Sequence, residues 1–276
     1  MIVTDRLIYL RLQKTASRHI ADLLVDLYGA ERRGQHRALA GRRDGRMVVG
    51  SVRNPWDWYL SLWAFGCAKG GQFRGHLTRP QRAWVQLRRR RTWQSAGSVA
   101  FHARQALVAT ARAHRWRRTY GDPADADRFR QWLRLMFGGD QFQTAVPPPI
   151  RHRLCASAGF MTYRYCSIFF DPSIWRDTRF RIEDVDALRT VDRDHNVLDR
   201  TILVENLEAD LIESLRAAGH EVPPEAEARI LAAAQKPAHK SAHGDAAEYY
   251  DAETSEMIAA REQFIVEKYG YTSPLW

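Results

Sequence analysis

The chain has few cysteines and no long hydrophobic run, and both shortages narrow the possible classes of protein. Its 276 residues include three cysteines, Cys67, Cys155 and Cys166, an odd number without the paired spacing of metal ligands. This usage favours a reduced protein without a structural zinc site. No apolar run approaches the roughly 20 residues that a membrane-spanning helix needs. The first residues lead directly into a predicted strand and do not resemble a signal peptide. We therefore expect a cytoplasmic protein with no membrane span.

Acidic residues are also in short supply relative to basic ones. The formal net charge is +10, and much of the excess is arginine between positions 74 and 118. A basic balance indicates an anionic partner, which could be a nucleotide, an acidic substrate, a nucleic acid or a membrane surface. Charge alone does not choose among these partners, and a solvated basic face is the simplest alternative.

Two stretches show the same order of strand, loop and helix start. In the first, apolar residues 6–12 predict a buried strand, and Lys14, Thr15, Ala16 and Ser17 form the loop that follows. Apolar residues then recur at helical spacing from Ile20 onwards, which predicts an amphipathic helix. This order presents backbone N–H groups, a helix dipole and a lysine to an anion.

The second stretch delivers an arginine in the same way. Residues 47–52 predict a buried strand, and Arg53 follows it directly. Asn54 then has the character of a helix cap, with Pro55 at the first helical position and Asp57 in the first turn. We expect these two junctions to bind one doubly anionic nucleotide.

The alternation of strands and helices predicts an α/β fold with a central parallel sheet flanked by helices, and with ligands at the carboxyl ends of the strands. Residues 201–205 predict a third strand, and Asn206 is expected to cap the helix after it. Another helix is expected to begin after Asp251 and end at Gly270. We expect a single domain over residues 1–276, in which residues 69–150 form a helical and loop insertion over the site.

The first loop is not a Walker A motif. It contains no glycine, its lysine precedes the hydroxyl residues, and no predicted strand ends in an Asp that could hold a metal. The loop could still hold a phosphate and sulfate pair through backbone N–H groups, Lys14, Thr15 and Ser17. An ordinary helix start without a ligand is the structural alternative.

Taken together, the Lys14-Thr15-Ala16-Ser17 loop and the segment from Val52 to Trp63 resemble the two nucleotide-binding signatures of sulfotransferases. These enzymes use 3′-phosphoadenosine 5′-phosphosulfate (PAPS) and have a fold similar to that of P-loop NTPases. The resemblance implies that the lysine loop grips the 5′-phosphosulfate, and that Arg53 and Ser61 bind the 3′-phosphate. It covers residues 6–66 and 201–271, and it implies no metal.

The implied reaction transfers a sulfuryl group from PAPS to a hydroxyl or amine of a carbohydrate or small-molecule acceptor. The base would be a histidine or glutamate. His36, between the two motifs, is the first candidate because a neutral imidazole suits the task near pH 7, and His19 is the second. The resemblance also places Lys240 and Ser241 where such enzymes close a loop over the nucleotide.

Some roles stay open at this stage. Arg18 stands where the family usually has a small hydroxyl residue, and it could contact the sulfate or face solvent. The arginine-rich middle, with Trp84, Trp93 and Trp116, would build an acceptor site for an anionic or a flat aromatic molecule. Two other functions remain possible, a P-loop small-molecule kinase and a basic nucleic-acid-binding protein. We expect no nucleic-acid partner if the sulfotransferase interpretation holds.

Overall fold

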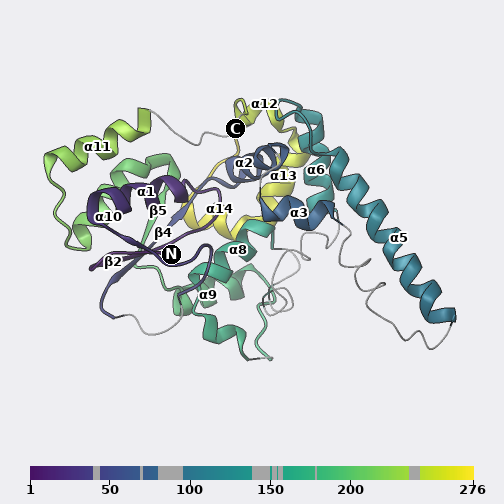
Figure 1. Ribbon diagram of the computed structural model, residues 1–276, viewed down its shortest axis with the longest axis horizontal. Coiled ribbons are helices and arrows are strands. Elements are labelled where there is room, and N and C mark those ends of the chain that lie inside the picture. The colour runs from purple at the N-terminus through teal and green to yellow at the C-terminus, as the bar shows by residue number, and fades with distance from the viewer. Residues whose placement is uncertain are drawn as a thin grey trace.

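The computed structural model describes residues 1–39, 44–68, 71–79, 96–138, 150, 154, 158–177, 179–235 and 243–276. Its centre is a five-stranded sheet with the order β3-β1-β2-β4-β5. The strands are β1 (Ile2–Val3), β2 (Leu7–Leu10), β3 (Glu31–Arg32), β4 (Met47–Val52) and β5 (Arg200–Leu203). Helices cover both faces of the sheet (Figure 1).

The sheet is mixed, so the prediction of a parallel sheet holds only for β2, β4 and β5. Strand β4 pairs in parallel with β2 and with β5, whereas β1 pairs antiparallel with both β2 and β3. The reason is the length of the first connection. The chain reverses between Val3 and Leu7, where Thr4 N–H donates to the carbonyl of Leu7 at 2.9 Å. Such a short turn leaves no room for the crossover that a parallel pair requires.

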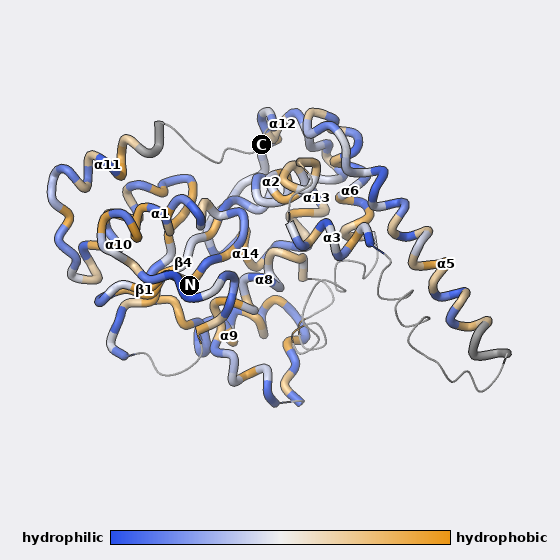
Figure 2. Tube along the Cα trace, in the orientation of Figure 1, coloured by the Kyte–Doolittle hydropathy of each residue, from blue (hydrophilic) through white to orange (hydrophobic). Residues whose placement is uncertain are grey.

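Alternate residues of β2 face two different cores, as the pleat of a strand requires. Leu7 and Tyr9 pack in one apolar cluster, while Ile8 and Leu10 pack in the other. The first cluster is covered by α1 (Ser17–Tyr28), α10 (Leu207–Ala217) and α11 (Pro224–Gln235). The second, larger cluster is covered chiefly by α2 (Pro55–Cys67), α8 (Phe160–Phe169), α9 (Val185–His195) and α14 (Gln263–Tyr269). Figure 2 shows the apolar residues concentrated where these layers meet.

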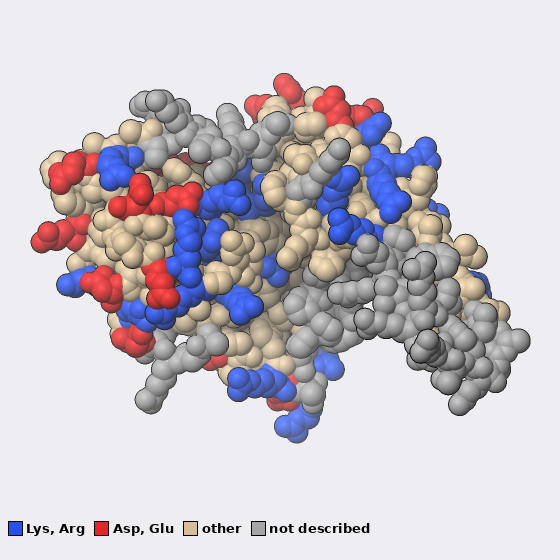
Figure 3. Space-filling view, viewed as in Figure 1, with Lys and Arg blue, Asp and Glu red and all other residues tan. Residues whose placement is uncertain are grey.

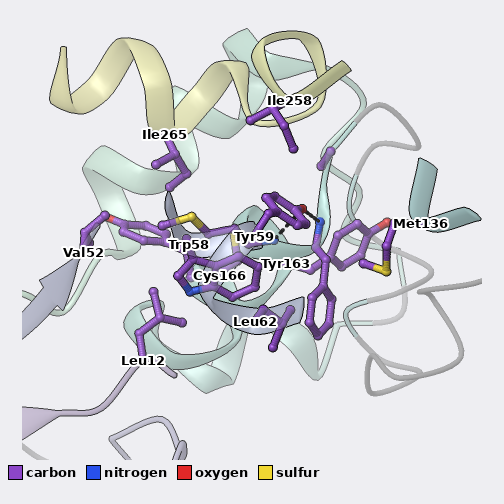
Figure 4. Close-up of a cluster of buried hydrophobic side chains, with 14 of the residues drawn as sticks. Leu12, Val52, Trp58, Tyr59, Leu62, Met136, Tyr163, Cys166, Ile258 and Ile265 are labelled. Carbon is purple, nitrogen blue, oxygen red and sulfur yellow. Dashed lines mark hydrogen bonds between the residues drawn. The ribbon is translucent and has the colours of Figure 1, made fainter. Parts of the chain in front are cut away.

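Helix α2 runs through the larger core. Ten of its residues are buried, and Figure 4 shows Trp58 and Tyr59 packed among side chains from distant parts of the chain. Those labelled neighbours include Leu12, Val52, Tyr163, Cys166, Ile258 and Ile265. The helix that carries the second junction is therefore held rigidly by the whole fold.

The remaining helices are α3 (Gln72–Thr78), α5 (Ala96–Arg118), α6 (Ala126–Phe137), α12 (Ala246–Tyr249) and α13 (Ala252–Arg261), with short 3-10 turns at Pro172–Trp175 and Val204–Asn206. Within the expected insertion, α6 buries Phe129, Trp132, Leu133 and Met136 as its periodicity predicts. Helix α5 lies beside α3 and α6 and projects from the body (Figure 1). Trp116 is completely buried, so it packs in the core and does not line an acceptor site. Trp84 and Trp93 lie outside the described residues.

Two predicted elements have different ends. The third parallel strand stops at Leu203, and the 3-10 turn at Val204–Asn206 leads into α10, whose start has no side-chain cap from Asn206. The predicted last helix is divided at Glu262, where the carboxylate turns inward to bind α8. In the described parts of the chain, no helix is both long enough and apolar enough to span a membrane.

Candidate functional site

The first junction is a strained loop that is fixed at its start. The Trp58 indole N–H donates to the carbonyl of Gln13 at 2.7 Å. Lys14 and Ala16 then adopt positive φ angles of 65° and 50°, a conformation that costs residues other than glycine free energy. Ala16 precedes α1 and gives it no side-chain cap, so the first N–H groups of this helix are left for another acceptor.

The hydroxyl of Thr15 is used inside the protein. Its Oγ1 donates to the carbonyl of Leu12 at 2.9 Å and lies 2.7 Å from Oγ of Ser51 on β4. Ser51 in turn donates to the carbonyl of Thr15 at 3.0 Å and lies 2.6 Å from the hydroxyl of Tyr9. Thr15 is completely buried. Contrary to the sequence-based expectation, only its backbone N–H remains for a ligand.

The second junction forms as the sequence predicts. Asn54 Oδ1 accepts the N–H of Trp56 at 3.0 Å, and Pro55 is the first residue of α2. The N–H of Asn54 donates to Glu205 at 2.7 Å, and the hydroxyl of Tyr271 donates to the same carboxylate at 3.2 Å. Glu205 therefore ties this junction to β5 and to the C-terminal segment.

The two junctions meet because β2 and β4 are parallel neighbours. Burial, together with the charges of Arg53 and Arg18, lowers the pKa of Lys14 to about 8. The Lys14 ammonium lies over the Phe65 ring of α2, 4.4 Å from its centroid. Arg53 has an ion pair with Asp57 at 3.5 Å. Arg18, whose role was open, is exposed and close enough to act on Lys14.

His243 is a member of this cluster that the sequence analysis missed. Burial lowers the pKa of His243, and the charges of Arg53 and Lys14 lower it as well, while Asp57 opposes them. Its Nδ1–H donates to the carbonyl of Gly244 at 2.9 Å. The only sequence signal was its place at the end of the polar loop that contains Lys240 and Ser241. Those two residues lie outside the described part of the chain.

His36 is bonded to the start of the first loop. Its Nδ1 lies 2.9 Å from the carbonyl oxygen of Arg11. Because a carbonyl only accepts, Nδ1 carries the proton, and Nε2 keeps its lone pair. Burial is the main cause that lowers the pKa of His36, and the charges of Arg164 and Arg11 add to it. The imidazole is therefore neutral near pH 7. His19 is half-buried in the first turn of α1.

Two arginines near His36, the buried Arg11 and the partly buried Arg164, were also missed. Arg164 of α8 donates from Nε to the side-chain oxygen of Gln13 at 3.0 Å, and burial lowers the pKa of Arg164 to about 10. Arg11 is 5% exposed, and its Nε has no hydrogen-bond partner among the residues that the structure describes. Arg11 directly precedes this loop in sequence, whereas only the fold brings Arg164 of α8 to it.

Ser61 is placed less favourably than its motif implies. It lies two turns into α2 with 2% of its surface exposed, so its hydroxyl does not line the surface beside Arg53. Ser17, at the start of α1, is 7% exposed. The exposed part of the site is therefore formed mainly by charged side chains and not by hydroxyl groups.

The surface agrees with a site for anions. Figure 3 shows a band of basic side chains left of the centre of one face, with acidic groups beside it and at the left edge and top of the view. Among the residues that the structure describes, no group of three or more His, Cys, Asp or Glu side chains is arranged to hold a metal ion. The fold and the site define an α/β protein with converging cations at the carboxyl ends of two parallel strands. No protein-family model, curated protein or solved structure matches the chain.

Proposed function

We propose that the protein is a sulfotransferase that moves a sulfuryl group from PAPS to a hydroxyl or amine of a carbohydrate or small-molecule acceptor. One observation carries the proposal: Lys14 and Arg53, from adjacent strand ends, are close enough for the arginine to lower the pKa of the lysine. Such repulsion is relieved by an anion placed between them. A nucleotide with a 5′-phosphosulfate and a 3′-phosphate has one anion for each junction.

The residues present fit this nucleotide. The Lys14 ammonium and the uncapped N–H groups of α1 suit the 5′-phosphosulfate. The guanidinium of Arg53 suits the dianionic 3′-phosphate, because its fork of donors binds two oxygens at once. Ser61 adds no support, since it is buried, and Asp57 partly offsets the charge of Arg53.

PAPS supplies an electrophilic sulfuryl group and a phosphate that leaves from it. Two residues of the chain then have defined tasks. Nε2 of His36 accepts the proton of the attacking hydroxyl, because Nδ1 carries the ring proton and donates it to the carbonyl of Arg11. The Lys14 ammonium offsets the negative charge that grows on the leaving phosphate. His36, Lys14 and the start of α1 all belong to, or contact, the first loop.

A transfer assay tests the proposal. With labelled PAPS and a panel of hydroxyl and amine acceptors, we expect label in at least one acceptor without added Mg²⁺. His36→Gln should lower kcat by about a hundredfold or more, as the loss of a general base does, and should leave nucleotide affinity nearly unchanged. His19→Gln, the matched control in the same region, should have little effect.

Two other outcomes would change the proposal. A large loss in His19→Gln with normal transfer by His36→Gln would reassign the base. Phosphoryl transfer from ATP that requires Mg²⁺, in the absence of transfer from PAPS, would replace the proposal with the kinase alternative.

A further inference from the structure

Helix α5 presents an unusual surface. It runs over 23 residues, Ala96–Arg118, which corresponds to a length of about 35 Å. It lies against α3 and α6 and projects away from the sheet (Figure 1). In its described part the buried residues are Ala106, Ala113 and Trp116, which form one narrow stripe at helical spacing.

The side of α5 away from this stripe mixes apolar and basic side chains. Phe101 and Val108 are seven residues apart and therefore lie on one side of the helix. They are 59% and 52% exposed. Arg104, Arg112 and Arg115 follow the same side at spacings of three, four and seven residues, and all three are exposed. None of them forms an ion pair with any residue for which the structure gives a position.

The sequence segment that leads into and includes this helix carries charge of one sign. Residues 69–118 contain 13 of the 42 Lys and Arg residues and none of the 32 Asp and Glu residues. Without acidic groups, the arginines have no local counter-charge in sequence. A second copy of the same face would be repelled, so the face is suited to an extended anionic surface.

We propose that the exposed face of α5, formed by Phe101, Arg104, Val108, Arg112 and Arg115, docks the protein on an anionic lipid surface. The exposed apolar side chains favour a lipid surface over a nucleic acid as the partner. A helix that lies in a membrane interface buries its apolar side chains beneath the headgroups while arginines contact the phosphates. Phosphate contacts of a nucleic acid come from charged and polar groups, and they give Val108 no role. This inference is independent of the sulfotransferase proposal.

Binding of the full chain to vesicles tests the inference. We expect cosedimentation with vesicles of phosphatidylcholine and phosphatidylserine, little with phosphatidylcholine alone, and weaker binding as salt rises. The double variant Arg104→Gln with Arg112→Gln should weaken binding by roughly tenfold or more. Phe101→Gln with Val108→Gln should weaken it by a similar factor, because both side chains lose their burial in lipid.

Matched variants control for charge and hydrophobicity in general. Arg176→Gln with Arg193→Gln removes two exposed arginines elsewhere, and Leu231→Gln removes an apolar side chain that is 50% exposed on α11. Neither should change vesicle binding, and thermal unfolding should show every variant folded. Absence of binding by the unsubstituted protein would overturn the proposal, as would binding that is indifferent to Phe101 and Val108. Tighter binding to duplex DNA or RNA than to vesicles, dependent on the arginines alone, would assign the face to nucleic acid instead.

Discussion

Lys14 is held in an unfavourable setting that an anion would relieve. It is half-buried, it faces the positive charges of Arg53 and Arg18, and it rests on the ring of Phe65. Each of these features except the ring favours the neutral amine. A bound phosphosulfate would reverse the balance, because it would raise the pKa of Lys14 above its value of about 8 in the free protein.

A pH dependence of nucleotide affinity follows from this shift. The affinity for adenosine 3′,5′-bisphosphate (PAP) should fall as the pH rises past about 8, the pKa of Lys14 in the free protein. The fall approaches about tenfold per pH unit while only the bound lysine is protonated. Lys14→Arg stays charged and should bind PAP with little change over this range. Calorimetric titrations on both sides of pH 8 measure the difference, and equal slopes for the two proteins would contradict it.

At the level of single residues, the sequence predicted which charged side chains lie together better than it predicted which hydroxyl groups face a ligand. Lys14 and Arg53 meet, as the two motifs suggested. The hydroxyls of Thr15 and Ser61 turned out to be buried, because a residue after a strand and a residue on an all-round apolar helix both face the core. His243 reaches the site from more than 180 positions further along the chain, which no local pattern reveals.

At the level of elements, the hydrogen bonds of Ser51 connect the two junctions. It bonds from β4 to the carbonyl of Thr15 and lies against the hydroxyls of Thr15 and Tyr9. Ser51→Ala leaves buried polar groups without this partner and should lower the free energy of unfolding by about 1–3 kcal/mol in urea. Ser214→Ala is the control, since that buried hydroxyl donates to the carbonyl of Asp210 in its own helix and should matter much less. Similar losses of the free energy of unfolding in both variants would show that the bonds of Ser51 to the first loop add no more stability than a bond within a helix.

Glu262 connects three helices and makes stability depend on pH. Between α13 and α14, its carboxylate accepts the N–H groups of Met161 and Thr162 at 3.0 and 2.9 Å, at the start of α8. The hydroxyls of Thr162 and Tyr59 also donate to it. Burial nevertheless raises the pKa of Glu262 from 4.5 to about 7.

The sign of the dependence follows from the raised pKa. Between pH 4.5 and about 7, Glu262 holds a proton in the folded protein that it has lost in the unfolded chain. The contribution of Glu262 to stability therefore falls as the pH rises through this range. Glu262→Gln cannot titrate, so its free energy of unfolding should vary less over this range, although it should be less stable overall. Urea unfolding at several pH values measures both slopes. A slope that is unchanged by the substitution would show that other groups cause it.

Elements with strong local signals were predictable from sequence. The strands β2 and β4 and the helices α1, α2 and α6 appear where their periodicity and caps place them. The antiparallel pairing of β1 was missed because two residues give no pattern to detect, and the break at Glu262 was missed because its cause is a contact with α8, about a hundred positions earlier.

At the level of the whole molecule, charge is divided between two regions. Residues 69–118 hold 13 basic and no acidic residues, so the rest of the chain has 29 basic against 32 acidic residues. The overall basic balance therefore comes from the sequence segment of residues 69–118, while the Lys14 and Arg53 cluster belongs to a part of the sequence that is nearly neutral. Because α5 projects from the body (Figure 1), Arg104→Gln with Arg112→Gln should leave PAP affinity within about twofold of the unsubstituted value. A large loss in calorimetry would show that the two regions act on one ligand.

Calorimetric titration of PAP into the full chain without Mg²⁺ measures whether the two junctions bind one nucleotide. We expect tight binding of PAP and poor binding of ATP. Arg53→Ala should weaken PAP binding by about ten- to a hundredfold, as the loss of a charge-assisted bond to phosphate does, and by more than Lys14→Ala, which should chiefly slow transfer. Failure of the protein to bind PAP, or preference for ATP in the presence of Mg²⁺, would contradict the central claim that the two junctions bind this one nucleotide.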